Sequence, residues 1–389
     1  MAQQQSSVRA MDDALWMRCA LDLARHGAGL ASPNPAVGAM LIRGGRVMGE
    51  GFHAYEGRKH AEILALEQAG KKAAGATLYI NLEPCSHTGR TGPCADALIG
   101  AGVRRVVAAM RDPNPSVAGR GFRKLRTAGI KVEIGLQEGE ARRLNAAFAR
   151  WITARLPFVT LKAAVTLDGQ LALPRERPSK RPPWISSRES RAEVHRMRHS
   201  SDALVTGIGT ILADDPLLTD RSSLPRRRRL LRVILDSKLR LPLRSRIVRA
   251  AKNDVLVFTA MPANHPRAKL LRKAGIEIVH LASKKTFRQP NLRDVLKELG
   301  RREIISVLLE AGSRLNSAAL ASDLVDRIVI FQAPTVSGRT ESPLADPQAM
   351  RNKKLWNVNV QRFGPDICIE ADLRKPSRTL PPSKKPRRR

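Results

Sequence analysis

The chain has 389 residues, 42% of them hydrophobic, which is enough to bury a substantial core in two or three domains and excludes an isolated small binding module. No apolar stretch approaches the roughly 18 to 20 residues of a membrane-spanning helix, and the polar start, residues 1–7, lacks a signal peptide's apolar segment. Four cysteines, at 19, 85, 94 and 368, exclude a disulfide scaffold. We therefore expect a soluble, cytoplasmic protein with no membrane partner.

The charge balance is unusual, because 69 Lys and Arg against 35 Asp and Glu give a net charge of +34. The first 150 residues carry +8 and the remaining 239 carry +26, with basic clusters at 175–181, 226–229 and 374–389. Pro-rich basic segments of this kind are usually solvated and disordered. The alternative is nonspecific binding of a polyanion, which needs only clustered charge. We predict that 374–389 is a disordered basic tail and leave its polyanion binding open.

Helix and strand signals alternate along the chain, which is typical of α/β architecture in both halves. The first half shows helical patterns over 11–26, 60–69, 94–102, 121–129 and 138–151, and strand patterns over 76–82, 103–110 and 130–134. Two short strands are expected within 37–47, around the turn at Gly44 and Gly45. A second series begins with a strand over 158–165, so we place a domain boundary near residue 152.

The sharpest chemical signal is one histidine and two cysteines in the first half. His60 and Glu62 open a predicted helix, Cys85 follows a predicted strand, and Cys94 begins the next helix. One His and two Cys suit zinc and leave its fourth position for a water, whose pKa the metal lowers to about 7. Glu62 is placed to carry protons to a departing amine, as in zinc deaminases with an H-x-E and P-C signature. The alternative is a closed structural site with His87 as fourth ligand.

These residues resemble the zinc-dependent cytidine deaminase superfamily, although eight residues separate Cys85 from Cys94 where the general pattern is C-x-x-C. The longer segment 83–94, EPCSHTGRTGPC, is similar to the deaminase domain of the bifunctional pyrimidine deaminase and reductase family of riboflavin biosynthesis. Segments 33–38, 49–53 and 111–115 extend the resemblance over most of 11–150. It implies a cytidine-deaminase-like three-layer α/β/α domain.

The same resemblance implies that Asn34 and His53 line a pyrimidine pocket. Two alternatives are open: Asn34 caps a turn bracketed by prolines, and His53 is a satisfied surface group.

The second half separates this family from cytidine and tRNA deaminases, which have no reason to carry another α/β domain. Segments 162–169, 184–186 and 206–219 resemble the family's reductase domain, which has a dihydrofolate-reductase-like fold and uses NADPH. The resemblance spans about residues 156–370.

A predicted strand over 304–309 enters a helix through Gly312, where backbone N–H groups suit a phosphate, unless the glycine only makes a tight turn. For Trp184 the alternative to a cofactor contact is an ordinary core residue. For Asp214 beside Asp215 the alternative is a helix-capping pair. The resemblance implies a full set of NADP-contacting positions: Ala164, Trp184, Thr210, Asp214, Ser237, Gly312, Ser313, Arg314, Leu315, Asn316, Ser317 and Ala318.

The resemblance also implies that Arg198, Leu218, Arg221 and Glu310 contact the reductase substrate, and guanidinium groups suit its phosphate. The alternative for any one arginine in so basic a chain is a solvated surface charge. Lys162 is a further candidate, with Glu310, for organising the sugar or assisting proton transfer.

One departure weakens the match in the reductase half. The family has a substrate-contacting Ser just before the Trp, whereas this chain has Pro182 in a basic, Pro-rich loop and so loses a hydroxyl and an N–H donor. Cys19 and Cys368 fit no motif, and we expect them to be small buried hydrophobes.

Together the residues and the resemblance predict a zinc-dependent deaminase domain over 1–152 and an NADPH-dependent reductase domain over 153–373. We expect sequential deamination and side-chain reduction of a phosphorylated pyrimidine in riboflavin synthesis, in a homo-oligomer. A tRNA deaminase with a basic RNA-binding extension is the enzymatic alternative. A polyanion-binding protein on a decayed enzyme scaffold is the other alternative, which the intact His60, Glu62, Cys85 and Cys94 set disfavours.

Overall fold

The computed structural model describes residues 2–55, 59–86, 92–171, 184–281, 290–338 and 342–375. The chain divides into two compact units, Met1–Phe158 with Val194–Leu308, and Val159–Glu193 with Leu309–Arg389, which we call unit 1 and unit 2. Within the described ranges, none of the helices combines the length and the apolar composition of a membrane-spanning segment.

The first part of unit 1 is built on a five-stranded sheet in the order β2-β1-β3-β4-β5. Strand β1 (Gly38–Arg43) pairs antiparallel with β2 (Arg46–Phe52) and with β3 (Thr77–Leu82). Strands β3, β4 (Arg105–Met110) and β5 (Lys131–Ile134) run parallel. Gly44 and Gly45 join β1 to β2 with φ of 57° and 70°, which confirms the predicted turn, because the favoured two-residue hairpin turns need positive φ.

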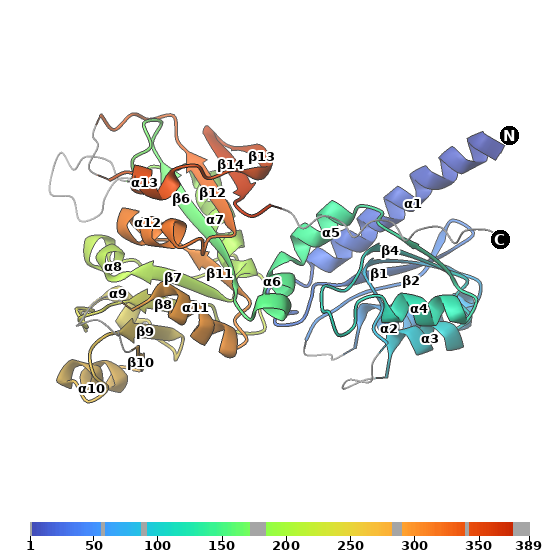
Figure 1. Ribbon diagram of the computed structural model, residues 1–389, viewed down its shortest axis with the longest axis horizontal. Helices are drawn as coiled ribbons and strands as arrows, with labels where there is room; N and C mark the ends of the chain where they lie inside the picture. Colours follow the sequence, from blue (N-terminus) through green and yellow to red (C-terminus); the bar gives the residue numbers. More distant parts are fainter. Residues whose placement is uncertain are drawn as a thin grey trace. The chain divides into compact units, whose positions relative to one another are not determined.

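Helices cover both faces of this sheet (Figure 1). Helices α1 (Ala2–Arg25) and α5 (Glu138–Leu144) contact one face, and α2 (Ala61–Ala69), followed by the short 3₁₀ helix η1 (Gly70–Ala73), packs on the other beside α3 (Cys94–Gly100) and α4 (Arg120–Thr127). The helices approach closely because the strands carry glycine: a Cβ on Gly38 would lie 2.1 Å from the Ala20 carbonyl oxygen of α1. The expected three-layer arrangement is confirmed.

The predicted helix over 138–151 is wrong as one element, since it divides into α5 and α6 (Ala146–Ala154) at Asn145. The Asn145 side chain accepts the backbone N–H of Ala36 at 2.9 Å and donates to the Ala36 carbonyl at 3.0 Å. The break therefore places an amide against the loop that carries Asn34. No pattern of apolar residues reports such a contact.

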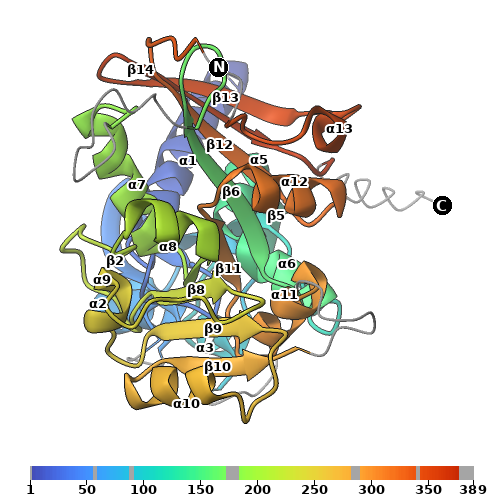
Figure 2. The same cartoon turned by 90° about the vertical axis from the view of Figure 1, so that its left-hand side faces the viewer.

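The rest of unit 1 holds four parallel strands, β7 (Ala203–Gly207), β8 (Leu231–Leu235), β9 (Val255–Thr259) and β10 (Glu277–His280). Figure 2 shows β8, β9 and β10 side by side. The helices are α8 (Ile208–Asp214), α9 (Arg246–Arg249), α10 (Pro266–Lys273) and α11 (Leu292–Arg301), and α7 (Arg188–Ser200) precedes β7. Their core is a buried aliphatic cluster that includes Leu204, Ile234 and Val257.

In unit 2, β6 (Phe158–Val165) runs parallel to β12 (Arg327–Gln332), which pairs antiparallel with β14 (Asp366–Asp372). Strand β13 (Trp356–Phe363) continues the antiparallel series, and the helices are α12 (Ser313–Ala321) and α13 (Pro347–Met350). Strand β11 (Ser306–Leu309) is divided, with residues 306–308 in unit 1 and Leu309 in unit 2. The strand order is β10-β9-β8-β7 within unit 1 and β6-β12-β14-β13 within unit 2. The mixed sheet with its helices confirms α/β architecture for the second half.

Of the two cysteines outside the motifs, Cys368 is buried and Cys19 is half-buried against the first core. The expectation of two small buried hydrophobes therefore holds for Cys368 and in part for Cys19.

Candidate functional site

The three predicted metal ligands meet in unit 1. His60 is the N-cap residue of α2, Cys94 is the first residue of α3, and Cys85 lies in the loop after β3. The His60 Nδ1 atom lies 3.1 Å from Cys94 Sγ and 3.6 Å from Cys85 Sγ, and the three donor atoms lie within 4.8 Å of one another. Ligands of a tetrahedral zinc ion are about 3.3–3.8 Å apart, so this donor set fits zinc with one position open.

A fourth protein ligand is absent from the described part of the chain, where the metal-binding group consists of these three residues. His87, the alternative fourth ligand, lies outside the described residues.

The electrostatics of the set also suit a metal. Hydrogen bonds with the Cys94 thiol and the His60 ring lower the pKa of Cys85, despite its burial. The backbone N–H of Cys94 donates to Cys85 Sγ at 3.3 Å and favours the same thiolate. A thiolate is the form that binds zinc.

Glu62 lies in the first turn of α2, only 3% exposed, and hydrogen-bonds to Cys94. Burial raises its pKa to about 7. A carboxyl group with a pKa near neutrality both accepts and releases protons at neutral pH, which is the property that acid–base catalysis needs.

Asn34 and His53 lie beside these ligands. The Lys59 carbonyl accepts the Nδ1–H of His53 at 2.9 Å, so Nε2 accepts the Asn34 amide at 3.0 Å. The rings of His53 and His60 meet edge-on with centroids 5.4 Å apart. His53 is buried, and burial lowers its pKa, so the alternative of a satisfied surface group is wrong. Asn34 binds a side chain rather than capping its own turn.

Glu83 is a structural residue to which the sequence reasoning gave no role. Its buried carboxylate accepts four backbone N–H groups, from Asp112, Gly119, Gly121 and Phe122, at 2.9–3.3 Å. It thereby fixes the loop that precedes α4 against the turn that carries Cys85. The sequence did offer one signal for this role, namely a carboxylate between a buried strand and the Pro-Cys pair.

Buried Asn81 performs a similar task, because it accepts the N–H of Gly38 at 2.9 Å and donates to the Ala36 carbonyl at 2.8 Å. No sequence signal distinguishes it from an ordinary strand residue.

Three of the predicted reductase-substrate residues come together in unit 1. Arg198 Nη1 donates to the Thr219 carbonyl at 3.1 Å, and Arg221 Nε donates to Thr219 Oγ1 at 3.2 Å. Leu218, the residue before Thr219, is buried and has a φ of 53°. The alternative of a solvated surface charge is wrong for Arg198, which this contact ties to the loop, while Arg221 is exposed at the same loop.

Unit 1 also holds three predicted NADP-contacting residues. Thr210 and Asp214 lie on α8, one helical turn apart, and Ser237 follows β8. The capping role falls to Asp215, whose Oδ1 accepts the N–H of Arg246 at the start of α9 at 2.8 Å.

Unit 2 holds the remaining reductase residues. Lys162 and Ala164 lie on β6, Glu310 follows β11, and the run from Gly312 to Ala318 begins α12 with Gly312 as N-cap residue. Asn316 is buried and donates to the carbonyls of Ala311 and Leu344, and Ser317 Oγ accepts the N–H of Asp346. Both therefore also hold the loop before α13 in place.

Trp184 is 74% exposed and stacks on the Arg191 guanidinium, so its alternative assignment to the core is wrong. Pro182, the departure from the reductase pattern, lies outside the described residues.

Two family models match the chain. The cytidine and deoxycytidylate deaminase zinc-binding region matches residues 11–110, and the RibD C-terminal domain matches residues 157–369.

Curated relatives match over nearly the full length. The riboflavin biosynthesis protein RibD of Aquifex aeolicus is 41% identical over 359 residues, covering 92% of this chain and 97% of the relative. RibD of Escherichia coli is 37% identical over 385 residues, covering 92% and 99%.

Solved structures agree with these relatives. A Thermotoga maritima diaminohydroxyphosphoribosylaminopyrimidine deaminase/5-amino-6-(5-phosphoribosylamino)uracil reductase has a TM-score of 0.80 at 36% identity, covering 94% of this chain and 99% of the other. Acinetobacter baumannii RibD, form 1, has a TM-score of 0.79 at 36% identity, covering 93% and 99%.

Proposed function

The chain belongs to the riboflavin biosynthesis protein RibD family of zinc-dependent deaminases joined to NADPH-dependent reductases, and on this basis we propose which residues carry each reaction. The deaminase removes the 2-amino group of 2,5-diamino-6-ribosylamino-4(3H)-pyrimidinone 5′-phosphate. The reductase then converts the ribosyl side chain to ribityl. We assign these reactions to residues 1–152 and 153–373, a division supported by the limits of the two family-model matches.

In the deaminase site, His60, Cys85 and Cys94 hold the zinc, which when bound makes hydroxide available from water at neutral pH. Glu62 takes the proton from the attacking water and delivers it to the departing amine, so that the net reaction consumes water and releases ammonia. The hydrogen-bonded pair of His53 and Asn34 lines the pyrimidine pocket. Its support is the 3.0 Å contact between them beside the ligand His60.

The reductase needs a binding site for the substrate phosphate and a binding site for the dinucleotide. Arg198 and Arg221 provide the phosphate seat with Leu218, and their convergence on Thr219 supports this assignment. Thr210, Asp214 and Ser237 contact NADPH together with Ala164, Trp184 and the start of α12. Glu310 contacts the substrate, and Lys162 assists at the sugar.

The buried Glu62 carboxyl group beside a three-ligand metal set is the observation that carries the deaminase assignment. An isolated tRNA deaminase is disfavoured, because the curated relatives match 92% of the chain and the second family model accounts for residues 157–369. We further place the reactions in the cytoplasm, where thiols stay reduced. Homo-oligomer formation and polyanion binding by the basic tail stay predictions.

Metal analysis with a matched pair of variants tests the assignment. Cys85→Ser should lose the zinc, whereas Glu62→Gln should retain about one zinc per chain and lose ammonia release. Full zinc occupancy in Cys85→Ser, or full deamination by Glu62→Gln, would contradict the residue roles.

A further inference from the structure

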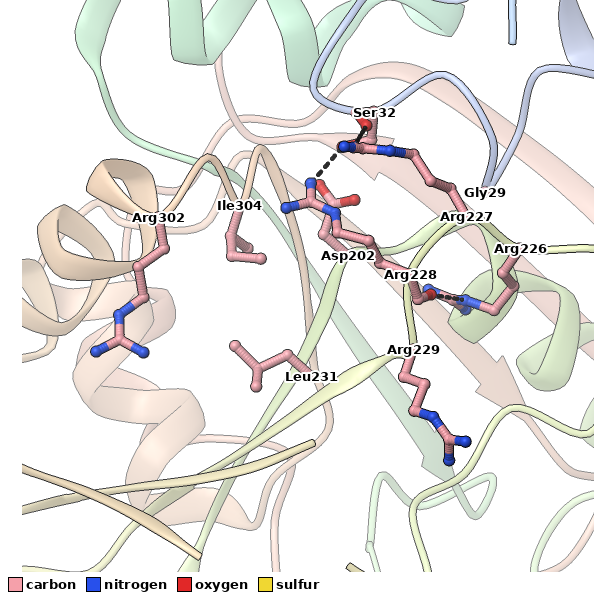
Figure 3. Close-up of a pocket in the computed structure, with 10 residues that line it drawn as sticks. All are labelled: Gly29, Ser32, Asp202, Arg226, Arg227, Arg228, Arg229, Leu231, Arg302 and Ile304. Carbon is pink, nitrogen blue, oxygen red and sulfur yellow. Dashed lines mark hydrogen bonds between the residues drawn. The ribbon is translucent and has the colours of Figure 1, made fainter. Parts of the chain in front are cut away.

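The arginine run 226–229 forms one side of a cavity in unit 1, which we call the arginine pocket (Figure 3). The sequence favours a solvated, disordered run, but Arg226, Arg227 and Arg228 are half-buried, so that expectation is wrong here. The cavity has a volume of about 300 Å³ and is lined by Gly29, Ser32, Asp202, Arg226, Arg227, Arg228, Arg229, Leu231, Arg302 and Ile304.

Two of the five arginines already have carboxylate partners. Arg226 pairs with Asp220 at 3.1 Å, and Arg302 pairs with Glu277 and Glu298 at 2.8 and 2.9 Å. The lining carboxylate, Asp202, accepts the backbone N–H groups of Ile305 and Ser306. Its Oδ2 atom therefore already has hydrogen-bond donors outside the arginine run.

The other three arginines have no carboxylate partner among the contacts of the described residues. Arg227 donates to the Ser32 carbonyl at 2.6 Å and stacks on Tyr55, with its guanidinium 3.3 Å from the ring centroid. Arg228 donates to the Glu303 carbonyl at 3.2 Å through Nη2 and approaches Ser32 Oγ at 3.5 Å. Arg229 is exposed. Three adjacent cations thus face one cavity with only neutral acceptors.

The cavity also has apolar walls. Figure 3 shows the side chains of Leu231 and Ile304 between Arg302 on one side and Arg228 and Arg229 on the other. A volume of about 300 Å³ lies at the lower end of the range for small-molecule sites, and guanidinium groups offer forked donors to phosphate oxygens. Size, charge and apolar walls together favour a small phosphorylated ligand over a nucleic-acid strand.

We propose that the arginine pocket is a binding site for the phosphate group of a small ligand, bound by Arg228 and Arg229 with Leu231 and Ile304 against its non-phosphate part. Arg226 and Arg227 brace the site. The proposal goes beyond the deaminase and reductase assignments, because it uses none of their residues and is tested by binding rather than turnover.

The pocket also has contacts toward both proposed substrate sites. The backbone N–H of Arg227 donates to the Gly29 carbonyl at 2.9 Å, and its side chain donates to the carbonyl of Ser32, two residues before Asn34. Arg226 donates to the Arg198 carbonyl at 2.9 Å. Arg226 and Arg227, which line the pocket, therefore hydrogen-bond to the end of α7 and to the loop before Asn34.

The test is calorimetric titration of the full chain with AMP and, separately, with inorganic phosphate, both in saturating NADPH so that the dinucleotide slot is filled. R228Q/R229Q should weaken binding at least about tenfold, because two charge-assisted donors are lost. The single variant R229Q removes an exposed side chain, keeps the fold, and should weaken binding in the same direction. AMP should bind more tightly than inorganic phosphate, because Leu231 and Ile304 would contact its non-phosphate part. Equal binding of the two probes would contradict that contact and overturn the assignment of a phosphate ester.

The matched control is R244Q/R249Q, which removes two exposed arginines that do not line the cavity. This variant should bind both probes as the unmodified protein does. Equal loss in R244Q/R249Q would show a general charge effect and overturn the proposal. Unchanged binding in folded R228Q/R229Q, or binding of an RNA oligonucleotide with neither small probe bound, would overturn it as well.

Discussion

The Asn34 side-chain amide donates to Nε2 of His53 across 3.0 Å. The direction of this bond is set elsewhere, because the Lys59 carbonyl accepts the Nδ1–H of the same ring at 2.9 Å. The His53 ring is therefore neutral and fixed in one tautomer. Burial lowers the pKa of His53, which also favours the neutral ring. This arrangement leaves the Asn34 side-chain carbonyl oxygen available to the pyrimidine pocket that we propose beside His60.

Asn34→Ala should lower kcat/KM of deamination by about 10- to 100-fold, since leaving a buried polar group without its hydrogen-bond partner costs about 1–3 kcal/mol. Zinc content should not change, because Asn34 holds no metal. Ammonia release and metal analysis on the same preparation measure both effects. A loss of zinc with unchanged kinetic constants per bound metal would show that Asn34 only supports the fold.

Gly121→Ala should weaken zinc retention, because a Cβ at Gly121 would lie 2.0 Å from the carbonyl oxygen of Pro84, the residue before Cys85. The backbone must shift, and a displaced second-sphere contact costs about 10- to 100-fold in metal affinity. Competition with a zinc chelator measures the change. Gly100→Ala is the matched control, since it lies at the exposed end of α3 with nothing within 4 Å of its added Cβ. Equal zinc retention in both variants would contradict the prediction.

Arg374→Gln should lower the free energy of unfolding by about 1–3 kcal/mol, because it removes the charged partner of a buried carboxylate. Arg374 pairs with Asp326, which is 1% exposed and also accepts the N–H of Val159 at 2.9 Å. Denaturant unfolding measures the change.

Truncation after Lys375 is the control for Arg374→Gln. The rest of the predicted tail, 376–389, lies outside the described residues. Its Pro-rich basic composition cannot build a packed site, so removing it should leave stability and both turnover rates nearly unchanged. A large loss of either activity on truncation would show that this segment contributes to a site.

Arg221→Gln should raise the KM of the reductase for its phosphorylated substrate by about 10- to 100-fold, because a charge-assisted bond to phosphate is lost. The KM for NADPH should stay the same. Arg244→Gln, an exposed arginine remote in sequence from the motif, is the charge-matched control. An equal rise in the KM for NADPH would instead place Arg221 at the cofactor.

Most helices and strands were predictable from the sequence, because the spacing of apolar residues indicates them. The metal ligands were predictable from their residue types. His60, Cys85 and Cys94 are soft ligands at the ends of elements, and the structure brings all three together. The break at Asn145 was not predictable, since it depends on a bond to Ala36, 109 residues away in the sequence.

The hydrogen bonds of Glu83 were not predictable for a related reason, and neither was the arginine pocket. Glu83 accepts N–H groups that become neighbours only after folding. The run 226–229 has the composition of a solvated segment, and only its contacts with Ser32 and Glu303 show that it is partly buried. Long-range partners decide both cases, and a single sequence does not contain them.

The most direct test of the account measures ammonia release and NADPH consumption by Glu62→Gln on each of the two substrates. With the diamino substrate, ammonia release should fall by about 10²–10⁴, because the proton carrier is lost. With the already deaminated pyrimidine, NADPH consumption should match the unmodified protein. Loss of both activities in a folded, zinc-loaded variant would contradict the account, because it would mean that the two reactions share Glu62.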